Sequence, residues 1–309
     1  MLIRDEGSGA PLVLIPGIQG RWEYMRPAVE ALARSFRVLT FPLCGERTCG
    51  LGFDPMLGLD NYTAQVVAIL DARRIDRAAI CGVSFGGLAA VRFAATHPER
   101  TAALVLASTP GPTWHLRKRH QIYARVPWLF GLLFLVESPF RLRRELAAAF
   151  PRRGDRRRFG IQQLRTLFTA PLSLSCMAER ARLMSTIDLV DDCRRVRTPT
   201  LVVTGERDLD RVVPIEGSAQ YVRLIAGAQS AVLERTGHLG SITRPEAFGS
   251  LVADFLSLRA REALSPLAED VAQFSRGPTP ARPRAAGAAP EGGLPRSGEA
   301  KGRTPDAAA

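Results

Sequence analysis

The stretch 81-CGVSFGGLAA-90 decides the fold. It places Ser84 between Gly82 and Gly86, after the apolar run Ala78–Cys81 and ahead of small residues that favour a helix. A serine on a sharp turn from strand to helix needs neighbours without a Cβ atom, because the turn presses those positions against adjacent backbone. The spacing G-x-S-x-G supplies such neighbours. It predicts a serine hydroxyl exposed above a sheet, at the N-terminus of a helix.

Strand and helix patterns alternate on both sides of this stretch. Short apolar runs bounded by turn residues predict buried strands at Leu12–Ile15, Phe36–Thr40, Ala78–Cys81, Ala102–Leu106, Thr200–Thr204 and Ser230–Leu233. Helical patterns are found at Glu23–Ala33, Thr63–Ala72, Phe85–Ala95, Pro214–Ile225 and Pro245–Leu256. This order predicts an α/β fold with a mostly parallel, doubly wound sheet.

The alternation breaks at 109-TPGP-112 and resumes at 197-RTP-199. The interval is mostly helical by composition, so we predict a helical cap, residues 112–185, inserted between two strands of one sheet. Its apolar run 126-VPWLFGLLFLV-136 is about half as long as a membrane span, and we interpret it as a buried or lid helix.

The remaining residues form the two parts of the core and a tail. The core comprises residues 1–111 and 186–260. Residues 261–309 are rich in Pro, Gly, Ala and Arg and have little to bury, so we predict a mostly disordered C-terminal tail.

The basic charge is concentrated in the cap. The chain of 309 residues carries a formal net charge of +12, and residues 112–185 hold fifteen basic residues against four acidic ones. Two interpretations stay open: the arginines attract an anionic substrate or make peripheral contact with an anionic membrane, or they form a solvated outer face. Nucleic-acid binding is not expected, because the arginines lack interleaved aromatic side chains.

The cysteines indicate a reduced environment. Their number, five, is odd, they fit no metal-ligand spacing, and Met1 leads directly into the polar segment Arg4–Gly9. We therefore expect a cytoplasmic protein that needs no metal and no cofactor. Cys44 and Cys49 could pair in an oxidising compartment. Cys81 is interpreted as a small core residue and not as a second nucleophile.

A serine hydroxyl becomes a nucleophile when a base removes its proton and a carboxylate orients that base. His97 lies at the far end of the helix that follows Ser84, roughly 20 Å away at 1.5 Å per residue, and His115 and His120 lie in the insertion. His238 follows the last predicted strand on a short glycine loop, which belongs at the carboxyl edge of the sheet. His238 is the predicted base.

The carboxylate must follow another strand. The strand Thr200–Thr204 runs into the loop 205-GERDLD-210, which presents Asp208 and Asp210 at the sheet edge. We prefer Asp208, because it lies at the shorter distance from the strand end.

The order Ser84, Asp208, His238 resembles the α/β-hydrolase superfamily, whose triad runs serine, acid, histidine along the chain. The resemblance covers roughly residues 10–258, and the insertion sits where family members carry a cap domain. Similar segments are the oxyanion loop 14-LIPGIQG-20, the segment 96-THPER-100, the acid loop 205-GERD-208 and the histidine loop with the last helix, 237-GHLGSITRPEAF-248.

The resemblance implies acyl-transfer chemistry, with the oxyanion held by the backbone amides of Ile18 and Phe85. Pro16 stands where the family commonly has histidine before the oxyanion-loop glycine. Because the donors are backbone amides, we expect the oxyanion hole to survive this difference.

We predict a carboxylesterase-like serine hydrolase that acts on a small-molecule ester, lactone or thioester with an apolar acyl part, through an acyl-enzyme intermediate. Candidate pocket residues are Trp22, Glu46, Trp128, Phe130 and Phe134. For Glu46 a salt bridge to an arginine is the alternative. Two other functions stay open: a ligand-binding or signalling protein on the same fold that turns over slowly or not at all, and an acyltransferase. The sequence predicts no oligomeric state.

Overall fold

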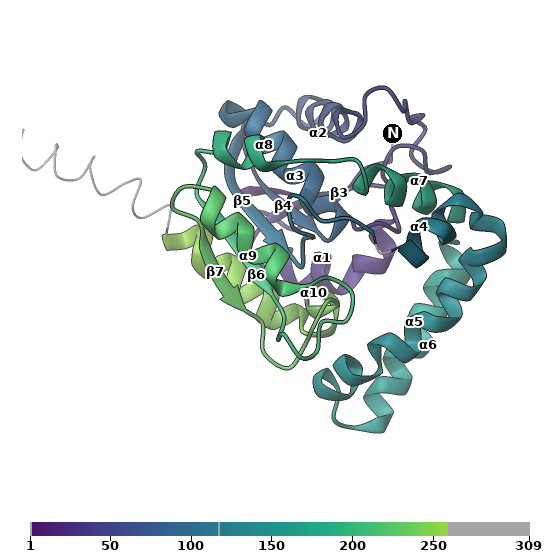
Figure 1. The fold of residues 1–309 in the computed structure, drawn as a ribbon. Helices are drawn as coiled ribbons and strands as arrows, with labels where there is room; N and C mark the ends of the chain where they lie inside the picture. The colour runs from purple at the N-terminus through teal and green to yellow at the C-terminus, as the bar shows by residue number, and fades with distance from the viewer. Residues whose placement is uncertain (1, 117, 259–309) are drawn as a thin grey trace, which may run out of the picture. The chain divides into compact units, whose positions relative to one another are not determined.

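The computed structural model describes residues 2–116 and 118–258, and the predicted tail lies outside them. Within these residues seven strands form one sheet in the order β1-β3-β2-β4-β5-β6-β7 (Figure 1). β1 runs antiparallel to β3, and all other neighbours are parallel. The strands are β1 (Arg4–Glu6), β2 (Pro11–Ile15), β3 (Arg37–Thr40), β4 (Ala78–Val83), β5 (Thr101–Ala107), β6 (Thr200–Thr204) and β7 (Gln229–Val232).

Helices connect most of the strands. Those of the core are η1 (Trp22–Met25), α1 (Arg26–Leu32), α2 (Asp60–Ala72), α3 (Phe85–Thr96), η2 (Pro98–Arg100), α8 (Val190–Arg195), α9 (Ile215–Leu224), α10 (Gly240–Thr243) and a last helix over residues 245–258. The predicted α/β fold with a mostly parallel sheet is confirmed.

The strand that the sequence did not predict is β1. Its residues Arg4–Glu6 are polar and partly exposed, so they carry no apolar run. The strand lies at the edge of the sheet, where an ion pair of 2.8 Å joins Asp5 to Arg37 on β3. β1 is a strand because it pairs with β3, and not because it buries apolar side chains.

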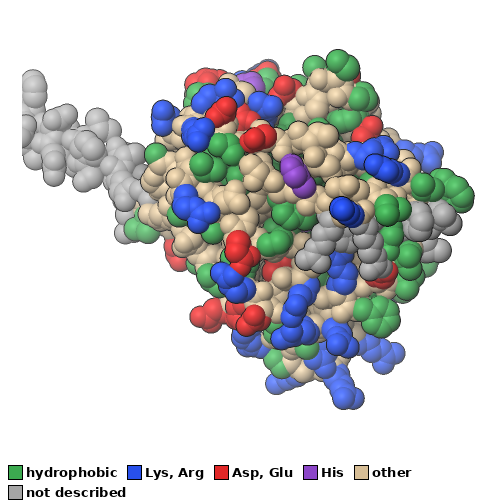
Figure 2. All heavy atoms as spheres, viewed as in Figure 1, with side chains coloured by type: hydrophobic (Ala, Val, Ile, Leu, Met, Phe, Trp, Pro, Cys, Tyr) green, Lys and Arg blue, Asp and Glu red, His purple; other side chains and the backbone are tan. Residues whose placement is uncertain are grey.

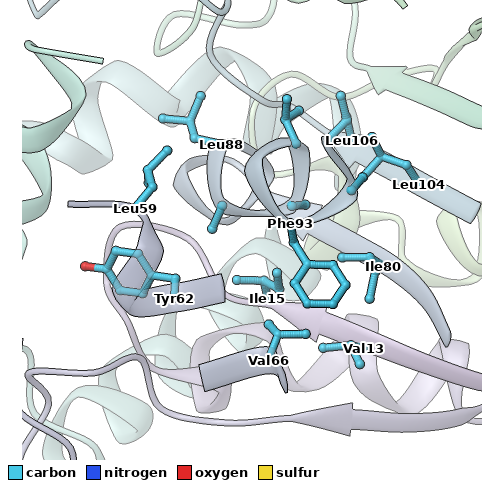
Figure 3. Close-up of a cluster of buried hydrophobic side chains, with 14 of the residues drawn as sticks. Val13, Ile15, Leu59, Tyr62, Val66, Ile80, Leu88, Phe93, Leu104 and Leu106 are labelled. Atoms are coloured by element: carbon cyan, nitrogen blue, oxygen red, sulfur yellow. The ribbon is translucent and has the colours of Figure 1, made fainter. Parts of the chain in front are cut away.

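Alternate residues of the central strands face opposite sides of the sheet. Val13 and Ile15 of β2 pack with residues of α2, α3, α8 and α9 (Figure 3), whereas Leu12 and Leu14 pack with α1 and the last helix. Each of these four side chains is fully buried. Helices cover both faces, as the continuous apolar runs of parallel strands require.

Within the segment predicted as the cap, between β5 and α8, the described residues form the helices α4 (Lys118–Arg125), α5 (Pro127–Ala149), α6 (Arg153–Thr169) and α7 (Leu174–Met184). Among the described residues, none of the helices has the length and apolar character needed to cross a membrane.

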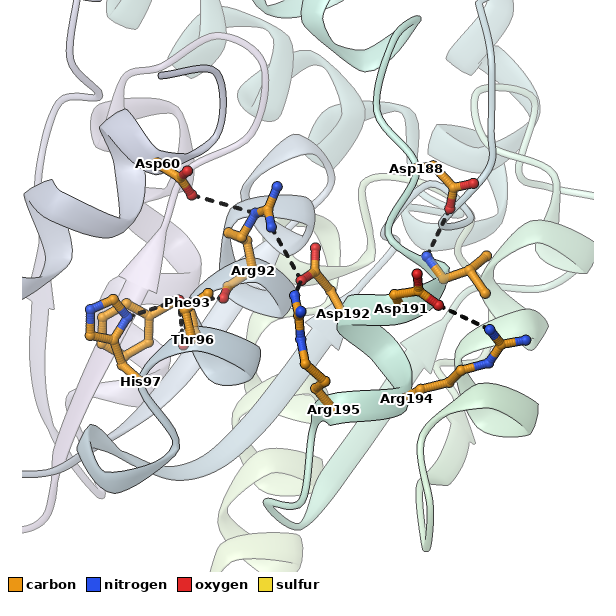
Figure 4. Close-up of polar contacts among 11 residues, drawn as sticks. Asp60, Arg92, Phe93, Thr96, His97, Asp188, Asp191, Asp192, Arg194 and Arg195 are labelled. Atoms are coloured by element: carbon orange, nitrogen blue, oxygen red, sulfur yellow. Dashed lines mark hydrogen bonds and ion pairs between the residues drawn. The ribbon is translucent and has the colours of Figure 1, made fainter. Parts of the chain in front are cut away.

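Helix α8 returns the chain from the insertion to the core, and Arg92 of α3 holds it there. The Arg92 guanidinium lies 3.3 Å from Asp192 of α8 and 3.4 Å from Asp60 at the start of α2 (Figure 4). Because the Asp192 side chain is buried, its charge needs the cations of Arg92 and Arg195 as partners.

The turn between β4 and α3 leaves no room for a side chain at its glycines. A Cβ atom at Gly86 would lie 2.3 Å from the carbonyl oxygen of Ile15, and one at Gly82 would lie 2.4 Å from that of Gly86. Neither oxygen belongs to a flexible side chain, so the backbone itself would have to shift.

We expect Gly86→Ala to lower the free energy of unfolding by about 2 kcal/mol or more, because it forces the backbone of β2 away from α3. Gly160→Ala is the matched control, since a Cβ atom at this position of α6 meets nothing within 4 Å. It should raise the free energy of unfolding by about 0.5 to 1 kcal/mol. Urea unfolding measures both, and equal effects of the two substitutions would contradict the packing described.

Candidate active site

Ser84 occupies the turn between β4 and α3 in a strained backbone conformation. Its φ is 53° and its ψ is −120°, a region that residues with a side chain rarely adopt. The Ser84 amide donates a hydrogen bond of 2.8 Å to the carbonyl of Ala107, at the end of β5. The turn directs the hydroxyl out of the sheet, toward the histidine loop.

His238 lies opposite Ser84, on the loop between β7 and α10. Its Nε2 atom is 3.1 Å from the Ser84 Oγ, within hydrogen-bond distance. The histidine side chain is 11% exposed. The predicted pairing of these two residues, 154 positions apart, is therefore present in the structure.

Asp210, and not Asp208, lies against the other ring nitrogen of His238. The Asp210 Oδ2 atom is 3.6 Å from His238 Nδ1, and the Asp210 side chain is 4% exposed. Its Oδ1 atom accepts hydrogen bonds of 2.9 Å from the amides of Val212 and Val213. Asp208 is exposed to solvent. The choice of Asp208 as the partner of His238 was wrong.

The reason lies in how two loops meet. A Cβ atom at Gly205 would be 2.4 Å from the carbonyl of Gly237, so the acid loop and the histidine loop touch directly beyond β6. After that contact the chain makes a turn in which the amides of Leu209 and Asp210 bond back to the Glu206 carbonyl. The turn carries Asp208 outward and Asp210 inward.

The environment of Asp210 favours the ionised form. Burial by itself raises the pKa of this carboxyl, but the contact with His238 and the amides of Val213 and Val212 lower it more, so the net shift is downward. A negative charge next to His238 Nδ1 favours a proton on that nitrogen and leaves Nε2 as the acceptor toward Ser84.

The predicted oxyanion-loop residues lie beside the serine. A Cβ atom at Gly17 would lie 3.5 Å from the Ser84 Cβ, and Ile18 lines the same cavity as Ser84. Phe85 is the first residue of α3, so its amide is among the N–H groups that a helix leaves without an internal partner. The oxyanion loop therefore lies beside Ser84, and the assignment of the two amides to the oxyanion stays a prediction.

The serine opens into a cavity of about 690 Å³ between the sheet and the inserted helices. Core residues on its wall include Tyr24, Val83, Val213 and Leu239. The inserted helices contribute mainly apolar side chains, among them Leu142, Leu146, Phe159, Leu164, Leu167 and Met177. The mainly apolar wall suits a hydrophobic substrate part.

The residues predicted for the pocket lie elsewhere where the structure describes them. Trp22 is buried in the core beside α1, and Trp128 is 79% exposed. Glu46 forms a buried ion pair with Arg180, which is the alternative that the sequence left open. The side chains of Phe130 and Phe134 are outside the described part of the structure. The apolar periodicity of α5 and α6 is weak, so the sequence offered little signal for the actual wall.

Arg180 of α7 ties the insertion to the oxyanion loop. Its Nη1 atom lies 2.8 Å from Oε1 of Glu46 and donates to the carbonyl of Ile18 at 3.1 Å, while Nη2 donates to the carbonyl of Cys44 at 3.2 Å. Both charged side chains are almost fully buried. One guanidinium therefore joins α7, the loop after β2 and the loop after β3.

Glu145 of α5 ties the insertion to the histidine loop. Its Oε1 atom accepts hydrogen bonds of 2.8 Å from the Thr236 hydroxyl and 2.6 Å from the Leu239 amide, on either side of His238. The side chain is fully buried, and Oε2 has no hydrogen-bond partner. Burial raises the pKa of Glu145, although these hydrogen bonds, the Gly237 amide and the nearby His238 lower it.

All five cysteines are free thiols. Burial raises the pKa of Cys81, next to the serine turn, to about 12, so this thiol stays protonated near neutral pH. Its place in the core agrees with the interpretation of Cys81 as a packing residue.

Comparison with known proteins agrees with the fold. The sequence pattern described as "Alpha/beta hydrolase family" matches residues 12–251. The chain belongs to this family, and its relatives are hydrolases.

Among those relatives, 2-hydroxy-6-oxo-2,4-heptadienoate hydrolase of Pseudomonas putida is 30% identical over 82% of this chain and 92% of its own length. The 2-hydroxymuconate semialdehyde hydrolase of Pseudomonas sp. is 28% identical over 85% of this chain and 92% of its own. A solved structure, the enol-lactonase of Burkholderia xenovorans, superposes with a TM-score of 0.67 at 24% identity, over 83% of this chain and 96% of that one.

Glu145→Gln should change how stability depends on pH. The pKa of Glu145 is raised in the folded protein above its ordinary value of 4.5, so folding binds a proton between the two values. The wild type therefore loses stability as the pH rises from 4.5 through the folded pKa, and a glutamine cannot titrate.

Urea unfolding at a series of pH values measures the free energy of unfolding of the variant and of the wild type. The value for the variant minus that for the wild type should increase over that pH range and then level off. Glu99→Gln, at an exposed carboxyl outside the insertion, is the control. A difference for Glu145→Gln that is flat from pH 4 to 8 would contradict the assigned direction.

Glu46→Gln should lower the free energy of unfolding by about 3 to 5 kcal/mol, because it leaves the buried Arg180 guanidinium without a counter-charge. Adding Arg180→Met removes that charge, so the double variant should be less unstable than the sum of the two single variants. A double-mutant cycle by urea unfolding tests this. Additive effects would mean that the ion pair contributes no coupling.

Proposed function

We propose that this protein is a serine hydrolase of carboxylic esters, or of related lactones or thioesters, with an apolar acyl part. The observation that carries the proposal is the chain of contacts from Asp210 through His238 to Ser84, which ends at an apolar cavity. A nucleophile, a base and an orienting carboxylate in this arrangement are what acyl transfer needs.

In the proposed reaction His238 Nε2 removes the proton of the Ser84 hydroxyl as its oxygen attacks the substrate carbonyl. The amides of Ile18 and Phe85 hold the oxyanion, and each such donor contributes on the order of 3 kcal/mol of transition-state stabilisation. His238 then passes its proton to the leaving group. Water, activated by the same imidazole, releases the acid from Ser84, while Asp210 holds the tautomer and orientation of His238.

The cavity supports an apolar acyl part, whereas the two alternative functions have weaker support. A binding or signalling role does not require the strained φ of Ser84, which holds the hydroxyl toward His238. An acyltransferase would need an acceptor alcohol or amine in place of water. Product analysis with added acceptors distinguishes it from a hydrolase.

Substitution of Ser84 or Asp210 should strongly reduce turnover, whereas substitution of the nearby Asp208 should not. We expect Ser84→Ala to lower kcat for p-nitrophenyl esters by roughly 10⁶, and Asp210→Asn by about 10⁴, because the wrong tautomer of His238 is then favoured. Asp208→Asn is the matched control and should stay within about twofold of wild type, because its side chain lies in solvent.

Circular dichroism of each variant shows whether the fold is retained. A larger loss for Asp208→Asn than for Asp210→Asn would exclude the proposed orienting role of Asp210. Background rates that are equal in wild type and Ser84→Ala across a series of acyl chain lengths would reject the esterase proposal itself.

A further inference from the structure

A second cavity, of about 610 Å³, lies beside the acid loop. We call it the arginine cleft. Its walls are residues 140–144 of α5, without Leu142, and the segment 207–216, without Asp208 and Leu209. Arg141, Val212 and Val213 line both this cleft and the apolar cavity that contains Ser84. The two cavities therefore adjoin each other at shared side chains.

The arginine cleft carries an unbalanced positive charge. Five arginines line it, Arg141, Arg143, Arg144, Arg207 and Arg211, and its two carboxylates are already engaged. Glu216 is paired with Arg207, and Asp210 lies against His238. Within the described residues no carboxylate is paired with Arg143, Arg144 or Arg211.

Several like charges around one concave surface repel each other, and a bound anion removes that repulsion. Guanidinium groups also match the oxygens of phosphate with two parallel hydrogen bonds each. The wall of the adjoining cavity is mainly apolar, although Arg141 and Arg156 also line it, so it favours apolar groups. A ligand that fits both sites combines an apolar chain with an anionic end.

Not every arginine of the insertion lines the cleft. Basic side chains gather at the lower end of the molecule in Figure 2, near the end of α5 and the start of α6 in Figure 1. Arg157 and Arg165 of α6 are exposed, as Arg143 and Arg144 of α5 are, but they do not line the cleft. Arg143 and Arg144 differ from them because they line the concave cleft, which adjoins the Ser84 cavity at Arg141, Val212 and Val213.

We infer that the arginine cleft binds a phosphate-bearing leaving group of the substrate, whose apolar acyl chain occupies the cavity at Ser84. This inference rests on the proposed function. For a thioester, Ser84 Oγ forms a bond to the carbonyl carbon and the carbon–sulfur bond breaks. His238 donates its proton to the leaving sulfur, and water then hydrolyses the acyl-enzyme. The products are a carboxylic acid and a phosphate-bearing thiol.

Binding can be tested without catalysis, by calorimetric titration of the whole wild-type chain with coenzyme A as the probe. The double variant Arg143→Gln/Arg144→Gln should bind this probe about tenfold or more weakly, because two charges that face its phosphates are removed. Arg157→Gln/Arg165→Gln removes the same charge from the same insertion and should stay within about twofold of wild type. Equal affinities for all three proteins would overturn the inference.

Kinetics with decanoyl-coenzyme A and p-nitrophenyl decanoate then show whether the substitutions affect recognition of the leaving group or of the acyl chain. In the Arg143→Gln/Arg144→Gln variant, KM should rise about tenfold for the anionic thioester, with kcat retained, and should not change for the neutral ester. An equal change for both substrates, or none for the thioester, would overturn the inference. If wild type hydrolyses neither compound, the proposed function fails, whereas the titration still decides whether the cleft binds phosphate.

An anionic membrane surface is the competing source of phosphate. Vesicles of phosphatidylglycerol are therefore included with the same proteins. If the Arg143→Gln/Arg144→Gln variant loses vesicle binding but keeps the wild-type KM for decanoyl-coenzyme A, the cleft serves a lipid surface and the inference is wrong. Unchanged vesicle binding together with the raised KM supports a soluble phosphate-bearing substrate.

Discussion

The close approach between Gly86 and the carbonyl of Ile15 is the constraint on which the site depends. It lets α3 begin directly against the end of β2, which forces Ser84 into its positive φ and directs its hydroxyl out of the sheet. Because Gly17 and Ile18 follow β2 at once, the same contact places their loop beside the serine. One backbone contact thus positions both the nucleophile and the loop opposite it.

The inserted helices do more than cover the cavity. Glu145 of α5 holds the two sides of the histidine loop, and Arg180 of α7 holds the carbonyl of Ile18. Each contact is made by a buried charged or polar group, so breaking it leaves an unsatisfied partner away from water. The substrate cavity and the placement of the candidate catalytic loops consequently depend on the same helices.

Much of the core could be predicted from the sequence, because its signals are local. Buried parallel strands such as β2 and β6 have short apolar runs in their sequences. The glycines around Ser84 indicate a turn that few other residues permit. His238 could be chosen because the other histidines lie in positions that a strand end does not reach. The edge strand β1 was missed because its three residues bury no apolar side chain and gain their structure from pairing with β3.

The sequence by itself determined the α/β fold, the serine turn and the loop that carries the histidine, since each follows from residue spacing within one segment. Only the tertiary structure decided between Asp208 and Asp210, because the contact of Gly205 with Gly237 sets which aspartate faces inward. The cavity wall, the Glu145 and Arg180 contacts and the arginine cleft were also decided there. Each joins side chains far apart in the chain, and no local pattern specifies which distant partner a buried charge will meet.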